Sequence, residues 1–190
     1  MIIQYLAKNQ NWAKITPFVG VIALVSLFYI FSVNNVYFWA LINIPLYLFH
    51  QTEEHFIPGG FKDFINKNVI HADSTHEVLT DIKVFWINVL MVWLAFAIFG
   101  ALSFVNIGFG LVIIVFSMMN CLTHIIQWIK LKCWNPGLVM ASIQFIISIY
   151  ASYFISTHGL SYVFFWWFAT ILFSIIAHIL LFKLVMSKNY

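Results

Sequence analysis

Long apolar stretches separated by short polar segments form the main pattern along this chain of 190 residues. A helix needs about 20 apolar residues to cross the roughly 30 Å of hydrocarbon in a bilayer. Six stretches reach or approach that length, and the breaks between them carry the asparagine, glycine and proline residues that punctuate helices. The pattern predicts an all-α fold, a polytopic bundle of six transmembrane helices in one membrane domain. The predicted spans cover residues 15–33, 36–56, 84–104, 107–129, 137–157 and 160–186, all within the domain 1–190.

The composition supports a membrane protein. Hydrophobic residues make up 63% of the chain, which is well above the roughly 45–50% of soluble domains. The mean hydropathy is +0.96, so the expected surroundings are a lipid bilayer. Nothing in the sequence indicates a nucleic-acid partner. Cys121 and Cys133 lack the spacing of a zinc or redox motif, so we interpret them as free thiols.

The lysines predict the orientation. All nine basic residues are lysines, and they fall before the first span, in alternate loops and at the end of the chain. The positive-inside rule then places both termini and the loop 57–83 in the cytoplasm. The abundance of Phe, Ile, Lys and Asn is typical of an AT-rich prokaryotic genome, which favours a plasma membrane.

The loop 57–83 has polar features of its own. All six acidic residues of the chain lie in the predicted cytoplasmic segment from Glu53 to Asp81, which contains most of this loop. Ser74 and Glu77 have the spacing of a capping box, which predicts that the third helix begins near Thr75. The sequence "PGG" at 58–60 predicts the turn by which the second span enters the loop.

Polar side chains within the predicted spans gather at one depth. A polar group in a span is costly and normally faces the interior of the bundle. At about 100° per residue, His50 and Glu54 lie some 40° apart, and Asn120, His124 and Gln127 share one stripe. The cytoplasmic third of the bundle is therefore expected to contain a shared polar site. The residues at this level include His50, Glu53, Glu54, Asn88, Asn120, His124, Gln127 and His178.

Four ordered motifs carry a family resemblance. The runs "LFHQTEEHFIPGGF", "FWIN", "NCLTH" and "WNPG", over about residues 45–145, resemble the HXXEE-domain family of integral membrane proteins of unknown function. The resemblance implies a membrane fold and a site, without a reaction. His55 stands where an aromatic residue is expected, so the resemblance does not assign it as a ligand. The implied site residues are His50, Glu53, Glu54, Asn88, Asn120, His124 and the Asn135-Pro136-Gly137 run.

Imidazole and carboxylate groups at one level favour a metal-assisted membrane enzyme. They are ligands for divalent zinc, iron or manganese, and a carboxylate outside the metal shell can act as a general base. Glu53 and Glu54 are the candidate catalytic residues, and Asn88, Asn120 and Gln127 are candidate contacts to ligands or substrate. The expected substrate is small or lipid-like and arrives from the cytosol or the inner leaflet. The candidate metal ligands are His50, Glu53, Glu54, His124 and His178.

Two other interpretations stay open. The same polar residues can form a purely structural hydrogen-bond network between helices. They can also belong to a proton- or cation-coupled transporter of small solutes, although the outer halves of the spans carry almost no ionisable groups. His71 and His76 are either further ligands or solvated residues of the loop.

Overall fold

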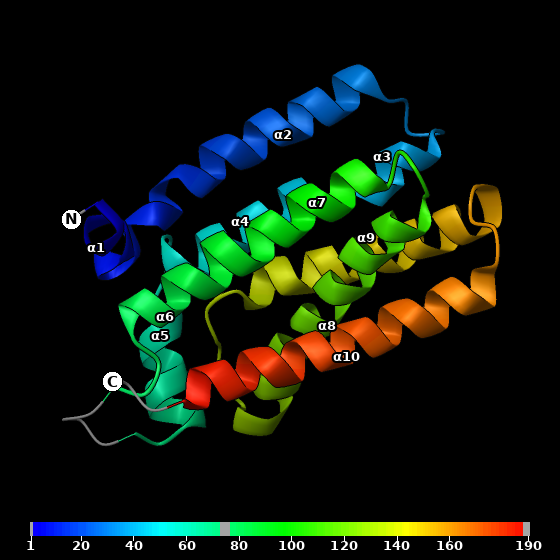
Figure 1. The fold of residues 1–190 in the computed structure, drawn as a ribbon. Helices are drawn as coiled ribbons and strands as arrows, with labels where there is room; N and C mark the ends of the chain where they lie inside the picture. Colours follow the sequence, from blue (N-terminus) through cyan, green and yellow to red (C-terminus); the bar gives the residue numbers. More distant parts are fainter. Residues whose placement is uncertain (1, 73–76, 188–190) are drawn as a thin grey trace.

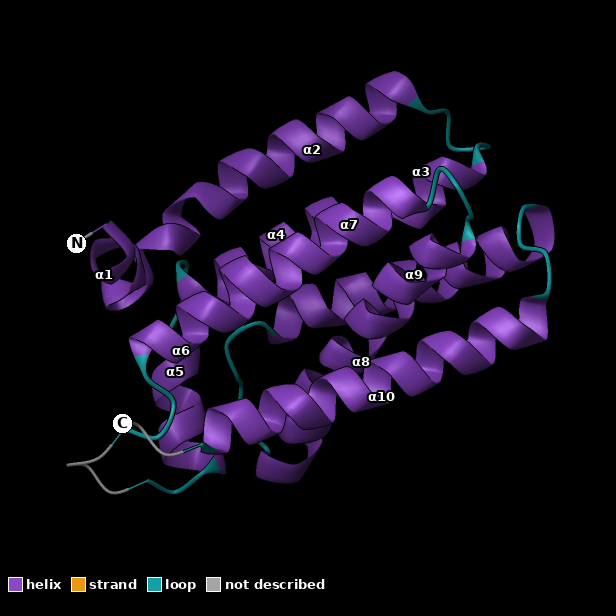
Figure 2. Ribbon diagram, viewed as in Figure 1, coloured by secondary structure: helices purple, strands orange, loops and turns teal. Residues whose placement is uncertain are grey.

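The computed structural model describes residues 2–72 and 77–187, and every regular element in that part of the chain is a helix (Figure 2). Among these residues, five helical stretches are long and apolar enough to cross a membrane. The all-α membrane fold is therefore confirmed. The five stretches are Ile2–Ile30, Asp81–Leu102, Gly108–Leu131, Leu138–His158 and Val163–Met186.

Two of the five stretches are composite and three are single helices. The first joins α1 (Ile2–Ala7), the 3₁₀-helical segment η1 (Lys8–Ile15) and α2 (Thr16–Ile30). The second joins α6 (Asp81–Phe85), the π-helical segment η3 (Trp86–Trp93) and α7 (Leu94–Leu102). The single helices are α8 (Gly108–Leu131), α9 (Leu138–His158) and α10 (Val163–Met186).

The prediction of six spanning helices is wrong, because the segment 36–56 is interrupted. It forms α3 (Val36–Leu41) and α4 (Asn43–His55), and each is shorter than a bilayer requires. Pro45 explains the break, since it has no N–H for the carbonyl of Leu41 and its ring crowds that carbonyl. The described residues therefore contain five candidate spans.

Helix α8 lies at the centre of the bundle (Figure 1). It packs against α9 and α10 along its length and also contacts α7, α3 and α4. A side chain at Gly110 would approach the Cβ of Ala40 to 2.6 Å, so the absence of one lets α8 lie close to α3. Helix α4 is enclosed by α2, α8 and α9, and its ionisable side chains are buried.

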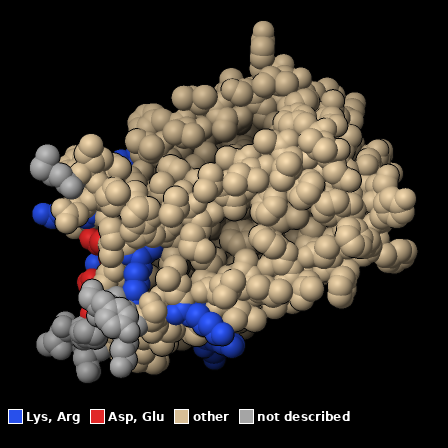
Figure 3. All heavy atoms as spheres, in the orientation of Figure 1, with Lys and Arg blue, Asp and Glu red and all other residues tan. Residues whose placement is uncertain are grey.

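One end of the bundle is charged. The helix α1, the short α5 (Phe61–Phe64), the π-helical η2 (Ile65–Val69), the start of α6 and the last turn of α10 all lie there (Figure 1). The Lys, Asp and Glu side chains visible on this face also gather at that end, which we call the charged end (Figure 3).

The turn that leads out of α4 forms at the predicted place. Gly59 and Gly60 both have positive φ angles, of 73° and 93°, which glycine adopts readily. Helix α6 begins at Asp81, and the side chain of Thr80 accepts a hydrogen bond from the backbone N–H of Lys83. The predicted cap at Ser74 and the helix start near Thr75 lie outside the described residues.

Candidate functional site

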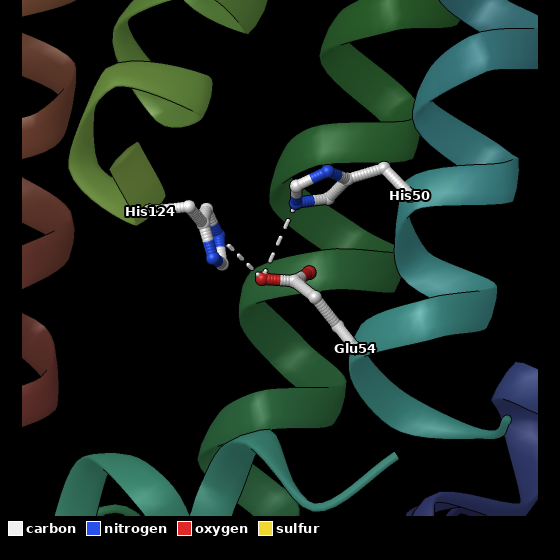
Figure 4. Close-up of side chains that lie close together, drawn as sticks. All are labelled: His50, Glu54 and His124. Carbon is white, nitrogen blue, oxygen red and sulfur yellow. Dashed lines mark ion pairs between the residues drawn. The ribbon is translucent and has the colours of Figure 1, made fainter. Parts of the chain in front are cut away.

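The carboxylate of Glu54 points between two imidazole rings in the interior of the bundle (Figure 4). Its Oε1 atom lies 2.9 Å from Nε2 of His124 on α8 and 3.4 Å from Nε2 of His50, one turn earlier on α4. All three side chains are almost fully buried. Asn120 adds an amide nitrogen 3.2 Å from Nε2 of His50. The sequence prediction of a site shared by these helices therefore has a defined centre, which we call the Glu54 centre (His50, Glu54 and His124).

The loop before α9 orients the His124 ring. The side-chain oxygen of Asn135 lies 2.9 Å from Nδ1 of His124, and its amide nitrogen donates to the backbone carbonyl of the same histidine. Because the Asn135 oxygen only accepts, Nδ1 carries the hydrogen and Nε2 is directed at Glu54. In a neutral ring, this Nε2 would present a lone pair to a carboxylate oxygen. The contact therefore calls for either a proton between the two groups or a metal ion.

Gly137 allows the loop to close over the Glu54 centre. Its φ angle is 95°, and a Cβ atom there would lie 2.7 Å from Cγ of Glu54 and 3.0 Å from Cε1 of His124. The "NPG" run thus supplies one residue that holds the imidazole and another that leaves space for it.

Glu53 is turned to a different partner. Its two carboxylate oxygens accept hydrogen bonds from the backbone N–H groups of Val139, at 3.1 Å, and Met140, at 2.6 Å. These are among the first N–H groups of α9, which have no partner within their own helix. A carboxylate at a helix N-terminus is also favoured by the helix dipole. Glu53 therefore caps α9 from α4.

A second hydrogen-bonded group adjoins the Glu54 centre on the side of η3. Nε2 of His55 lies 3.4 Å from Oε2 of Glu54 and 3.4 Å from the Asn88 amide nitrogen. Gln51 donates to Asn88 and accepts from the indole N–H of Trp93. Within the described part of the chain, Asn88 is therefore linked to the Glu54 centre through His55. The sequence motifs assigned no role to His55 and did not point to Gln51, although the four-residue spacing of these two places both on one face of α4.

Other predicted residues lie elsewhere. His178 packs its ring against Phe116, with centroids 4.7 Å apart, and its Nδ1 bonds to the carbonyl of Ser174. It does not belong to the Glu54 centre. The side-chain oxygen of Gln127 is buried without a hydrogen-bond partner among the residues the structure describes. His71 is exposed, and His76 lies outside the described residues.

A polar cavity of about 220 Å³ connects the charged end with Glu54 and His55. Lys62 and Asp81 line its far side, 3.2 Å apart, and Asp81 also accepts hydrogen bonds from the backbone of Asn9 and the side chain of Gln10. Water can therefore come close to Glu54 from this end of the bundle.

The donor set of the Glu54 centre suits a divalent metal ion. One atom from each of its three side chains lies within 4.8 Å of the others. Ligands bound to one tetrahedral zinc ion at about 2.0–2.1 Å lie roughly 3.3 Å from one another. The distance from Glu54 to His50 is close to this value, and the 2.9 Å from Glu54 to His124 is shorter. Two imidazoles and a carboxylate also form the ligand set of catalytic sites that keep one position open.

The comparisons with known proteins establish the family. The model of the HXXEE family, described as "Protein of unknown function with HXXEE motif", matches residues 41–152, which is more than half of the chain. The chain therefore belongs to this family of proteins with an HXXEE motif. Here the motif is His50, Glu53 and Glu54. No curated protein and no solved structure matches the chain.

Proposed function

We propose that the protein is a metal-assisted membrane enzyme that acts on a small or lipid-like substrate. In this proposal the Glu54 centre holds one divalent ion, of zinc, iron or manganese. The contact between Nε2 of His124 and the carboxylate of Glu54 carries the proposal. It is short, it is buried, and the hydrogen on Nδ1 is already committed to Asn135.

Each side chain then has a distinct role. His50, Glu54 and His124 bind the ion, and Asn135 keeps the His124 ring in the tautomer that leaves Nε2 free. His55 holds the second oxygen of Glu54, and Asn120 contacts His50. When bound, the ion supplies Lewis acidity to a substrate oxygen. Glu53 stays out of this set because its two oxygens are used by α9.

The surroundings of the Glu54 centre favour a small or lipid-like substrate and indicate how the protein is oriented in the membrane. The polar cavity reaches Glu54 from the charged end, which we assign to the cytoplasm by the positive-inside rule. The other half of the bundle is packed with apolar side chains such as Leu111 and Ile114. A site with one polar approach and apolar walls suits an enzyme better than a conduit across the membrane. In this proposal the whole chain is one membrane domain with both termini on the cytoplasmic side.

The test is metal content, measured by mass spectrometry on protein purified without a polyhistidine tag. Wild type is compared with Glu54→Gln and His124→Ala, and Glu53→Gln is the matched control on the neighbouring carboxylate. We expect near-stoichiometric metal in wild type and in the control, and loss of the metal in the other two variants. The control keeps an oxygen that can still accept hydrogen bonds from α9.

Three outcomes contradict the proposal. Folded wild-type protein without metal would indicate that the Glu54 centre is a protonated hydrogen-bond network. Loss of metal from Glu53→Gln, with α9 still folded, would show that Glu53 is a metal ligand, contrary to the proposal. Transport of a labelled solute into proteoliposomes would favour the transporter interpretation instead.

A further inference from the structure

An apolar hollow of about 190 Å³ lies between α7 and α10, with α8 as its floor. Every side chain that lines it is apolar. Figure 3 shows no Lys, Arg, Asp or Glu over the middle of this face of the molecule. The lining includes Met91, Ala95, Phe96, Phe116, Ala177 and Leu180.

The hollow opens toward the region where the bilayer lies. Met91 and Leu180, on its rim, are 43% and 55% exposed, and both belong to candidate membrane spans. Water finds no hydrogen-bond partner in such a lining, whereas an apolar cavity of about 150 Å³ accommodates a hydrocarbon as large as benzene. A helix is about 10 Å wide and is too broad for this volume. A single hydrocarbon chain fits both the size and the chemistry.

The ring of Tyr47 lies between the inner wall of the hollow and the Glu54 centre. Phe96 and Phe116 line the hollow, and both pack on Tyr47, with ring centroids 4.9 and 6.5 Å away. Tyr47 in turn stacks on His50 at 5.7 Å. Along α8, Phe116 precedes His124 by about 12 Å at 1.5 Å per residue. An extended amphiphile can therefore lie along α8 with its chain in the hollow and its head near the Glu54 centre.

We propose that the hollow binds the acyl chain of a membrane amphiphile whose polar head is directed toward the Glu54 centre. The assignment of that amphiphile as substrate rests on the proposed function, while binding of the chain does not. The chain enters sideways from the bilayer between α7 and α10. The head group meets the water that reaches Glu54 through the polar cavity.

Photo-crosslinking in lipid nanodiscs tests this site. The probe is a long-chain fatty acid with a diazirine in the middle of the chain, and the labelled peptides are identified by mass spectrometry. Ala177→Trp and Ala95→Phe fill the hollow from α10 and α7, respectively. Ala23→Trp is the matched control, because Ala23 lines a different apolar hollow beside α2. Metal content is measured on the same samples.

We expect wild type and Ala23→Trp to be labelled on residues 91–99 and 173–181, and the two filled variants to lose that label. Equal labelling of the filled variants, a label concentrated on α2, or a crosslinked second copy of the chain would overturn the assignment. If the filled variants do not fold, the wild-type peptide map decides. Label in the hollow of a protein without metal would overturn the proposed function alone, and metal without label would overturn the acyl-chain site alone.

Discussion

The two halves of α8 are packed in different ways. From Leu111 to Phe116 the helix buries apolar side chains, and Leu111, Ile113 and Ile114 are fully enclosed. From Asn120 onward its buried face is polar, and His124 bonds to Asn135 and contacts Glu54. The first half is held by shape and tolerates only apolar substitutions that conserve volume. The second half depends on specific atoms, so the chemistry of the protein is to be sought there.

The largest effect on stability is expected in the apolar half. Leu111→Ala removes a fully buried side chain and should lower the free energy of unfolding by about 2–5 kcal/mol. Denaturant unfolding in detergent measures this loss. Metal content should be unchanged in the folded variant, and a loss of metal there would show that the two halves are not separable.

Gly137→Ala should disturb the polar half almost as strongly. The left-handed backbone costs about 1–3 kcal/mol with a side chain, and the new Cβ meets Glu54 in addition. Gly60→Ala is the matched control, because its φ angle is similar and the nearest atom to its Cβ is 4.0 Å away. Only Gly137→Ala should lose both stability and metal. Equal behaviour of the two variants would mean that backbone strain alone matters.

Asn135→Ala should act on metal binding more than on folding. It releases Nδ1 of His124, and loss of such a partner typically weakens metal affinity by about 10–100-fold. Competition with a metal chelator measures the affinity. The comparison variant is Asn106→Ala at the far end of α8, where the Asn106 side chain accepts a hydrogen bond from the backbone N–H of Gly108. That variant should lose about 0.5–2 kcal/mol of stability with unchanged affinity, and the opposite pattern would refute the role of Asn135.

The smallest effect is expected at the charged end. Burial lowers the pKa of Lys62, but its hydrogen bonds to Glu77 and Asp81 outweigh this, and the net pKa lies above the ordinary 10.5. The paired, charged lysine therefore adds stability below pH 10.5, and this contribution disappears as the pH rises through the raised pKa. Because the pair is partly solvated, Lys62→Met should cost only about 0.2–1 kcal/mol at neutral pH. Thermal unfolding of both proteins at neutral and alkaline pH measures the difference, and an unchanged difference at alkaline pH would contradict this account.

The sequence was sufficient to predict the class of fold and the level of the site, but not all of its partners. The length of the apolar stretches predicted the helical membrane fold. It did not reveal the break before Pro45, so α3 and α4 were predicted as one span, 36–56. Helical spacing placed His50 near Glu54 because both belong to one helix. It could not choose between Glu53 and Glu54, which lie about 60° and 40° from His50 on opposite sides. Which of the two glutamates faces the histidines depends on where α9 starts, because the first N–H groups of α9 bind Glu53. The packing of α4 against α9 determines this.

The cap that Glu53 provides for α9 has a consequence for biosynthesis. Val139 follows Glu53 by 86 residues. At about 5–20 residues per second, α9 leaves the ribosome some 4–17 s after α4. His124 follows Glu54 by 70 residues, so for most of that interval the acidic end of α4 has neither α9 nor the ring of His124 as a partner. The nascent chain must therefore keep this segment hydrated, or shielded by the insertion machinery, until the later helices arrive and draw it into the bundle.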